Sequence, residues 1–246
     1  LKAQNSELAE AENMRRDFSS NVSHEMKTPL QVISGYAELM KNDMVQPADR
    51  QKFAALIYDE AQTMRSLIND VLTLSKLDES AFENDGAAAI NLYVVAQRVA
   101  GRLASFAADQ HVKVQVEGAS ACIAGSETLA EEMLYNLIEN GIRYNHEGGS
   151  VTMKVGSERV EGSPAGAEAW QTVVRVSDTG PGIPAELHDK VFERFFRVDK
   201  SRSKETGGTG LGLAIVKHAV MYHGGAIEVE SAEGQGTTFV LRFPSA

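Results

Sequence analysis

The sequence is poor in cysteine, and it lacks both a long apolar run and an excess of positive charge. Its one cysteine, Cys122, cannot form a disulfide within the chain, which agrees with a reducing compartment. No run of about 18 apolar residues occurs, and the first residues carry no signal-peptide pattern, so no segment is predicted to span a membrane. The fold must therefore rest on an ordinary hydrophobic core.

Basic residues are outnumbered by acidic ones. The chain has 24 Lys and Arg against 34 Asp and Glu, a formal net charge of −10. Because an acidic chain repels the phosphate backbone, we expect no nucleic-acid partner. The sequence also lacks an initiator methionine and opens directly in a polar helical pattern, so we expect a fragment of a longer protein.

The most regular feature of the sequence is a pair of long amphipathic segments. Apolar residues recur at steps of three and four over residues 1–44 and again over 50–77, a spacing typical of helices. Pro47 cannot continue the first helix, and Asp49 can cap the second. The chain is therefore predicted to begin with a helical hairpin.

The predicted hairpin leaves apolar surface uncovered. Its two stripes bury each other only partly, so a coiled-coil-like seam stays open along both helices. A homodimeric four-helix bundle would close this seam, and we expect that arrangement. The alternative is that the hairpin packs against the rest of its own chain.

The stretch "SAFENDGAAA" breaks the helical period, and the pattern then becomes mixed α and β. We predict a helical domain over residues 1–82, a linker over 83–89 and an α/β domain over 90–246. Helices are predicted at 91–109, at 126–143 and after "GLGLAIVKHAV". Strands are predicted at 112–118, 150–155, 170–178, 225–231 and 237–244, with a loop over 157–169.

The stretch "SHEMKTPL" places a histidine in the first predicted helix. Because each helical residue turns about 100°, His24 points away from the apolar stripe, with Glu25 beside it and Thr28 one turn on. A neutral imidazole can act as a nucleophile, and an adjacent carboxylate can hold the proton on the other nitrogen. Pro29 removes a backbone donor, so we expect a kink or bulge near His24. Taken alone, such a histidine is more often ordinary surface.

Two stretches of the second domain suggest contacts to a nucleotide. "NLIENGIRYN" puts Asn136 and Asn140 on one helix face, with Arg143 and Tyr144 one turn further. An amide oxygen suits Mg²⁺, and an arginine suits phosphate oxygens. The alternative is that these residues form only the polar face and the C-terminal cap of an ordinary helix.

"SDTGPGI" places Asp178 at the end of a predicted strand, followed by Gly180 and Gly182. The carboxylate can accept a hydrogen bond from an exocyclic amine such as that of adenine, and the glycines permit close backbone approach. A simple turn is the alternative.

"GGTGLGLAIVKHAV" places four glycines before an apolar helix, whose N-terminus offers free N–H groups to phosphate. The spacing fits neither the Walker nor the Rossmann pattern. Just upstream, "FERFFRVDKSRSKET" combines aromatic and basic residues, among them Arg194 and Arg197, and suggests a lid that closes over phosphates. A charged surface loop is the alternative.

Taken in chain order, "NLIENGIRYN", "SDTGPGI", "FERFFRVDKSRSKET" and "GGTGLGLAIVKHAV" resemble the N, G1, F and G2 boxes of sensor histidine kinases. "GQGTTF" resembles their last glycine box, and "SHEMKTPL" resembles their phospho-acceptor box. The similarity extends from about Arg16 to Phe243, nearly the whole chain. Several motifs in fixed order, preceded by a helical hairpin, make this resemblance specific.

The resemblance implies a fold, an activity and partners. The fold is a helical hairpin that forms a dimeric four-helix bundle, followed by an α/β sandwich with a mixed sheet and helices on one face, the Bergerat type of ATP-binding domain. The activity is ATP- and Mg²⁺-dependent phosphorylation of His24, then transfer to an aspartate of a response-regulator receiver domain, with phosphatase activity in reverse. The resemblance also implies a homodimer, and a cytoplasmic portion of a protein anchored in a bacterial membrane.

The resemblance further implies roles for single residues. His24 would be phosphorylated, Glu25 would assist the transfer, and Thr28 would position water for dephosphorylation. Asn140 would hold Mg²⁺, and Asp178 would read adenine. The other residues implied to line the nucleotide are Asn136, Arg143, Tyr144, Gly180, Gly182, Ile183, Arg194, Arg197, Gly208, Thr209, Gly210, Leu211, Gly212, Leu213 and Thr237.

Departures from the family pattern are small. Gly141 stands where alanine is usual, Arg143 where lysine is frequent, and Met26 and Lys27 where leucine and arginine are common. None of these removes a reacting group, so we expect an active kinase.

Two other classes of protein fit parts of the sequence. An ATP-driven clamp of the chaperone, gyrase or mismatch-repair type shares the ATP-binding fold, but the histidine-bearing hairpin upstream and the lack of a transducer domain after Phe243 speak against it. A dimeric scaffold that binds ATP only structurally is the second. Asn140 and Asp178, both intact, argue against a scaffold.

Overall fold

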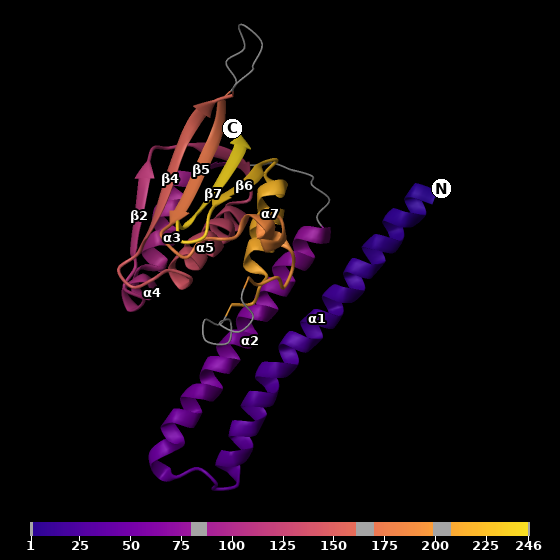
Figure 1. Ribbon diagram of the computed structural model, residues 1–246, viewed down its shortest axis with the longest axis vertical. Coiled ribbons are helices and arrows are strands. Elements are labelled where there is room, and N and C mark those ends of the chain that lie inside the picture. The colour runs from indigo at the N-terminus through magenta and orange to yellow at the C-terminus, as the bar shows by residue number, and fades with distance from the viewer. Residues whose placement is uncertain (1, 80–87, 161–169, 199–207, 246) are drawn as a thin grey trace.

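The computed structural model describes residues 2–79, 88–160, 170–198 and 208–245. A long helical hairpin is followed by an α/β domain that lies against the second hairpin helix (Figure 1). Most of the predicted linker, part of the predicted 157–169 loop and the basic stretch 199–207 of the predicted lid fall outside the described residues. In the described ranges, no helix has the length and apolar character needed to cross a membrane.

The predicted hairpin is confirmed. Helix α1 runs over Lys2–Lys41, a 3₁₀ turn η1 over Pro47–Asp49, and helix α2 over Arg50–Glu79. In the connection, Asp43 adopts a left-handed φ of 52° and accepts a 2.8 Å hydrogen bond from Arg50. The two helices therefore lie antiparallel and close together, with a short polar turn that closes the hairpin.

Helix α1 continues through the position of its proline. Pro29 lies inside the helix, and its side chain is buried. The hydroxyl of Thr28 reaches the carbonyl oxygen of His24 at 3.5 Å. The helix is thus not broken at Pro29, and the kink near His24 stays a prediction.

The α/β domain is built on a five-stranded mixed sheet. The strands are β2 (Lys113–Gly118), β4 (Ser150–Arg159), β5 (Trp170–Asp178), β6 (Ala226–Ser231) and β7 (Thr237–Pro244). Their order across the sheet is β2-β4-β5-β7-β6. The β2–β4 pair is parallel, and the other neighbours are antiparallel. A separate antiparallel pair, β1 (Ala88–Asn91) and β3 (Cys122–Gly125), was not predicted, and β1 begins inside the predicted linker.

The helices of this domain are α3 (Leu92–Arg102), α4 (Ala104–Asp109), α5 (Glu127–Arg143) and α7 (Gly212–Tyr222), with 3₁₀ turns η2 (Ala185–Leu187) and η3 (Lys190–Phe192). Side chains cap two of the starts: Asn91 accepts from the N–H groups of Tyr93 and Val94, and Ser126 accepts from that of Leu129. The single helix predicted over 91–109 is two helices, because the chain leaves helical geometry at Leu103 (φ −90°, ψ 0°).

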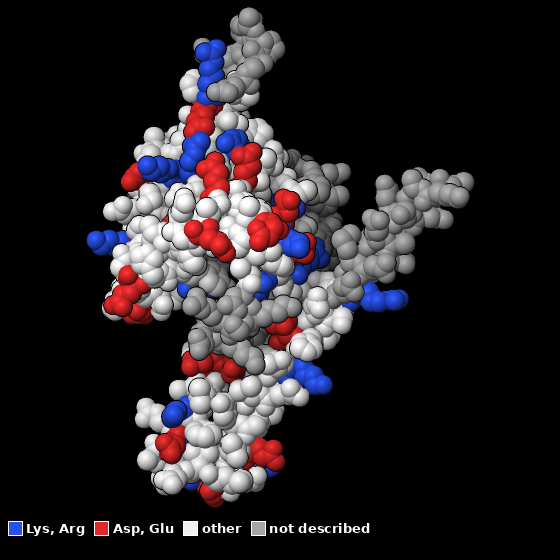
Figure 2. Space-filling model, viewed as in Figure 1, with Lys and Arg blue, Asp and Glu red and all other residues white. Residues whose placement is uncertain are grey.

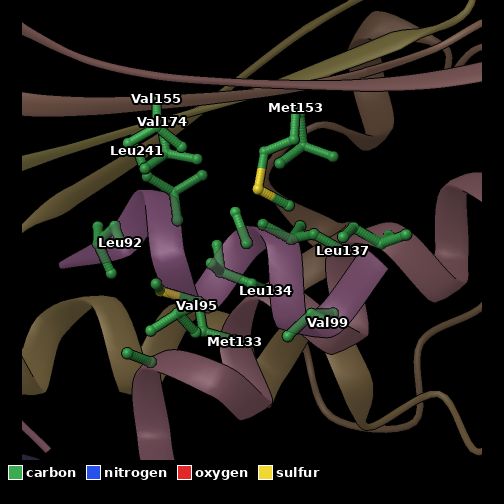
Figure 3. Packing of buried hydrophobic residues seen from close by; sticks show 14 of the residues in the cluster. Leu92, Val95, Val99, Met133, Leu134, Leu137, Met153, Val155, Val174 and Leu241 are labelled. Carbon is green, nitrogen blue, oxygen red and sulfur yellow. The ribbon is translucent and has the colours of Figure 1, made fainter. Parts of the chain in front are cut away.

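The main core lies between the sheet and the helices on one of its faces, as predicted. Figure 3 shows Leu134 and Leu137 of α5 beneath Met153, Val174 and Leu241 of three neighbouring strands, with Leu92 of α3 and Met133 of α5 in the same cluster. These side chains are almost fully buried, and burying each large apolar side chain contributes roughly 1.5–3 kcal/mol. The sheet therefore holds α5 at a fixed distance from the strand ends.

A second apolar cluster joins the hairpin to the α/β domain. It consists of Leu67 and Leu74 of α2 together with Leu211, Ala214 and Ile215 at the start of α7. Part of the open seam of the hairpin is thus covered by its own chain, the alternative that the sequence left open. Among the hairpin side chains that the structure describes, the large apolar ones that stay exposed are Leu30, Met44, Tyr58, Ile68 and Leu72.

Candidate functional site

His24 lies on the hairpin in the orientation that its helical position predicts. Its side chain is 80% exposed, and its Nδ1 atom lies 4.0 Å from Oε1 of Glu25. A carboxylate on this side favours a proton on Nδ1, which leaves the lone pair on Nε2 free and facing away. The geometry of the pair therefore suits a nucleophilic Nε2.

Asn136 lies buried at the contact between α5 and α7. Its amide nitrogen donates to the carbonyl oxygen of Glu132 at 2.9 Å, and its Oδ1 faces Gly212, where an added Cβ would lie only 2.6 Å away. Gly212 thus allows α7 to start directly against the amide group. Asn140, four residues on, lies half-buried on the same helix.

Arg143 and Tyr144 end α5 and diverge. Nη2 of Arg143 donates to Glu139 at 2.6 Å, and its guanidinium lies 5.5 Å from the ring centre of Phe106. The hydroxyl of Tyr144 points instead to Gly208, where a Cβ would lie 2.9 Å from it. Tyr144 therefore joins the glycine loop to the helix, whereas Arg143 is held on the side of α4.

Asp178 lies at the end of β5, where two backbone N–H groups bind its carboxylate. Its Oδ1 accepts hydrogen bonds from the N–H groups of Gly180 (2.8 Å) and Thr237 (3.3 Å). Burial raises the pKa of the carboxyl above its ordinary value, and these two bonds partly offset the effect. Because both donors bind Oδ1, the second oxygen, Oδ2, can accept from a ligand.

Backbone packing explains the glycines around Asp178. Gly182 has a φ of 74°, and a Cβ there would lie 1.9 Å from the carbonyl oxygen of Ala232. The neighbouring N–H of Ile183 donates to the hydroxyl of Ser231 at 2.8 Å, which in turn lies 3.0 Å from the hydroxyl of Thr237. Ser231 thus links two predicted site residues, and no motif in the sequence had singled it out.

The glycine loop before α7 also has a defined shape. Gly210 adopts a φ of 72°, and its carbonyl oxygen accepts from the N–H of Phe195 at 2.8 Å. The N–H of Leu211 donates to the hydroxyl of Thr209 at 3.2 Å, and Leu213 follows half-buried in the first turn of α7.

Two basic residues of the preceding segment, Arg194 and Arg197, face the hairpin. Arg197 donates to the carbonyl oxygen of Gly208 and lies 3.8 Å from Oε2 of Glu25. The guanidinium of Arg194 lies 4.9 Å from the ring centre of Phe18. The predicted phosphate residues Arg194 and Arg197 are therefore drawn toward α1 in this structure.

The structure brings most of the predicted residues together in two groups, whereas Arg143 lies toward α4 and Arg194 and Arg197 lie toward α1. The first is His24, Glu25 and Thr28 on α1. The second lies where the end of β5, the C-terminal half of α5 and the start of α7 converge. On the face in Figure 2, acidic and basic side chains are interspersed over the α/β domain. Besides Ser231, sequence reasoning missed Asp70, Asn145 and Thr179, each of which bonds to or beside a predicted site residue.

Comparison with known proteins accounts for both groups. Residues 14–80 match the His Kinase A (phospho-acceptor) domain, and residues 125–246 match the histidine kinase-, DNA gyrase B- and HSP90-like ATPase family. The first match holds His24, and the second holds Asp178 and the glycine loop. The two families occur together in a defined class of enzyme, the protein histidine kinases.

The relatives specify the class further. The chain is 35% identical over 240 residues to the sensor-like histidine kinase SenX3 of Mycolicibacterium smegmatis. The aligned region covers 97% of this chain and 60% of SenX3. It is 34% identical over 238 residues to the phosphate regulon sensor protein PhoR of Pseudomonas aeruginosa. This alignment covers 96% of this chain and 51% of PhoR. Full-length ShkA in complex with AMPPNP has a TM-score of 0.64 at 28% identity, over 92% of this chain and 45% of that one. This chain belongs to the sensor histidine kinases, and it spans about half to three fifths of the length of these curated relatives.

Proposed function

We propose that this chain phosphorylates itself on His24 at the expense of ATP and passes the phosphoryl group to an aspartate of a response regulator. The observation that carries the proposal is the exposed imidazole of His24, with Nδ1 beside Glu25, on a hairpin that packs against the glycine loop of an ATPase fold. An accessible nucleophile and a nucleotide site on adjoining domains are what such a transfer requires.

ATP, the substrate, fits the second group of residues. Asp178 would accept a hydrogen bond from the exocyclic amine of adenine through Oδ2, because Oδ1 already accepts two bonds. The loop Gly208 to Gly212 and the start of α7 would bind phosphate oxygens through N–H groups, and Gly180, Gly182, Ile183 and Thr237 would line the base. Asn140 supplies a hard amide oxygen for Mg²⁺, which when bound neutralises phosphate charge.

The transfer step involves few protein groups. Nε2 of His24 forms a bond to the γ-phosphorus as the bond from that phosphorus to the bridging oxygen of ADP breaks, and ADP leaves. The proton on Nδ1 stays, and the Glu25 carboxylate stabilises the positive charge that the ring gains. Catalysis then consists mainly of positioning and of neutralising phosphate charge, for which Arg194 and Arg197 would have to leave the hairpin.

Partners and the reverse reaction follow from the hairpin. Exposed apolar side chains such as Ile68 and Leu72 would pair with those of a second copy in a four-helix bundle. The exposed face around His24 would receive the receiver domain of a response regulator, and Thr28 would position water for dephosphorylation. As in a sensor, the full-length protein would carry a membrane anchor that leaves this portion in the cytoplasm.

The test is incubation with γ-labelled ATP and Mg²⁺, comparing wild type with His24→Gln. We expect a label that survives alkali, is lost in acid and is absent from the variant. Lys27→Gln, a neighbouring exposed position, serves as a control that should keep the label. ATP binding by wild type without any acid-labile label would overturn the proposal and favour a structural role for the nucleotide.

A further inference from the structure

The hairpin presents carboxylates to two groups of the proposed nucleotide site. Oδ2 of Asp70, on α2, accepts a hydrogen bond from the hydroxyl of Thr209 at 2.7 Å. On α1, Oε2 of Glu25 lies 3.8 Å from Nη2 of Arg197. Thr209 and Arg197 are both groups that the proposed function assigns to phosphate. In the docked arrangement each of them binds a carboxylate of the hairpin instead.

The position of Asp70 is set by apolar packing on both sides of it. Leu67 and Leu74, about one helical turn before and after it, are buried against Leu211 and Ile215 of the α/β domain. The hydroxyl of Thr209 that donates to Asp70 also accepts from the N–H of Leu211. The carboxylate is therefore held at the N-terminal end of α7, where the unpaired N–H groups and the helix dipole favour an anion.

The surroundings of Asp70 are acidic. The pKa of this carboxyl is raised from 3.8 to about 6, mainly by burial; the Thr209 hydroxyl lowers it, and Glu132 and Glu139 of α5 contribute to the rise. At neutral pH, Asp70 thus places a negative charge directly on the glycine loop, within the electrostatic reach of Glu132 and Glu139. A polyphosphate that entered this loop would meet the charge of Asp70.

We propose that Asp70 sets the nucleotide affinity of the site from outside the ATPase domain, by occupying with its carboxylate a place on the glycine loop that a phosphate group would take. The proposal rests on the function proposed above. Docking of the hairpin on α7 and binding of a polyphosphate then oppose each other. The opposition grows with phosphate charge, so that ATP is affected more than ADP, and adenosine is unaffected.

The test uses Asp70→Asn in the full chain. The amide oxygen can still accept from Thr209, but the charge is gone. With Mg²⁺ present at pH 7.5, we expect the dissociation constant of ATP to fall roughly three- to tenfold, the range for removing one nearby charge from a partly screened site. The constant for ADP should fall less, and that for adenosine should not change. Asp59→Asn makes the same charge change at an exposed position of α2 and should alter none of them.

Two further measurements separate the effect of the Asp70 charge from that of side-chain packing. Asp70→Glu keeps the charge and should leave ATP affinity near that of wild type, which separates charge from packing. At pH 5.5, below the pKa of about 6, most of the wild-type carboxyl is protonated, so the advantage of the Asn variant should shrink. Equal ATP constants for wild type and Asp70→Asn, in samples that label His24, would overturn this inference while the proposed function stands. If wild type binds no ATP, the proposed function and this inference fall together.

Discussion

The hydroxyl of Thr179 donates a 3.0 Å hydrogen bond to the amide oxygen of Asn145, and this bond ties the loop after β5 to the residues that follow α5. The amide nitrogen of Asn145 donates to the carbonyl oxygens of Gly141 (3.0 Å) and Ser150 (3.1 Å). One side chain thus joins the end of the helix, the start of β4 and the residue next to Asp178.

We expect Asn145→Ala to misplace Asp178 and weaken the reading of adenine. Removing partners from half-buried polar groups costs about 1–3 kcal/mol, so the dissociation constant of ATP should rise roughly tenfold. The constant for GTP, which has no amine at that ring position, should change much less. Calorimetric titration with both nucleotides would measure the two constants. A uniform loss for ATP and GTP would mean that Asn145 serves stability alone.

A methyl group at Gly212 should damage the site. Its Cβ would lie 2.6 Å from Oδ1 of Asn136, and relieving such overpacking costs about 1–3 kcal/mol. We expect Gly212→Ala to weaken ATP binding by roughly tenfold. Gly35, in α1, has no neighbour within 4 Å of an added Cβ, so Gly35→Ala should instead stabilise the hairpin by about 0.5–1 kcal/mol. Thermal unfolding measures the stability of both variants, and ATP titration measures their ATP affinity. The prediction is wrong if Gly212→Ala and Gly35→Ala change both quantities in the same way.

The buried His223 should make stability depend on pH. Its Nδ1 lies 2.6 Å from the carbonyl oxygen of Ala219 and donates to it, and its Nε2 accepts from the N–H of Ser126 at 3.2 Å. Burial lowers the pKa of this imidazole below 6.5. The neutral form is therefore favoured in the folded state, and its contribution to stability is present above pH 6.5 and lost as the pH falls toward the lowered pKa.

We expect the free energy of unfolding of wild type to fall between pH 7.5 and pH 5.5, by at most about 1.4 kcal/mol per pH unit from this group. His223→Gln should be less stable at pH 7.5 and lose this part of the pH dependence. His146→Gln, at an exposed position, should keep the wild-type slope. Urea unfolding at several pH values measures the slopes, and identical slopes in all three proteins would contradict the assignment.

The open seam of the hairpin should control assembly. Leu72 is 53% exposed, and Ile68, one turn earlier, is 38% exposed. If the seam is a dimer interface, a charge at its centre has no partner when buried. Light scattering after size exclusion should then find Leu72→Glu as a monomer and Ser66→Glu, at an exposed position on the far side of the same helix, as a dimer. A dimer that survives Leu72→Glu would place the interface elsewhere.

Much of this architecture could be predicted because the signals are local. The bounds of β5 and β7 follow from runs of β-branched and aromatic residues, and the hairpin follows from two long helical periods. The short strands β1 and β3 could not be predicted, because four residues are too few for a period to emerge. Within the site, Asp178 and the glycines of "SDTGPGI" and "GGTGLG" could be predicted from these sequence motifs.

The contacts that sequence reasoning missed depend on topology. Asp70 and Thr209 are 139 residues apart, and Ile183 and Ser231 are 48 apart. Neither pair lies in one motif, so only the packing of the domains reveals them.

Helix α1 has 40 residues, which at 1.5 Å each make a rod of about 60 Å. Phe18 contacts Phe195, with ring centres 5.8 Å apart, and Glu25 lies beside Arg197. The two positions are seven residues apart, close to two whole turns, and so face the same direction. A twist of α1 about its own axis, by a fraction of a turn, would carry both residues away from the α/β domain together. The helix can thus transmit torque, and it needs no bend to release the segment that precedes the glycine loop.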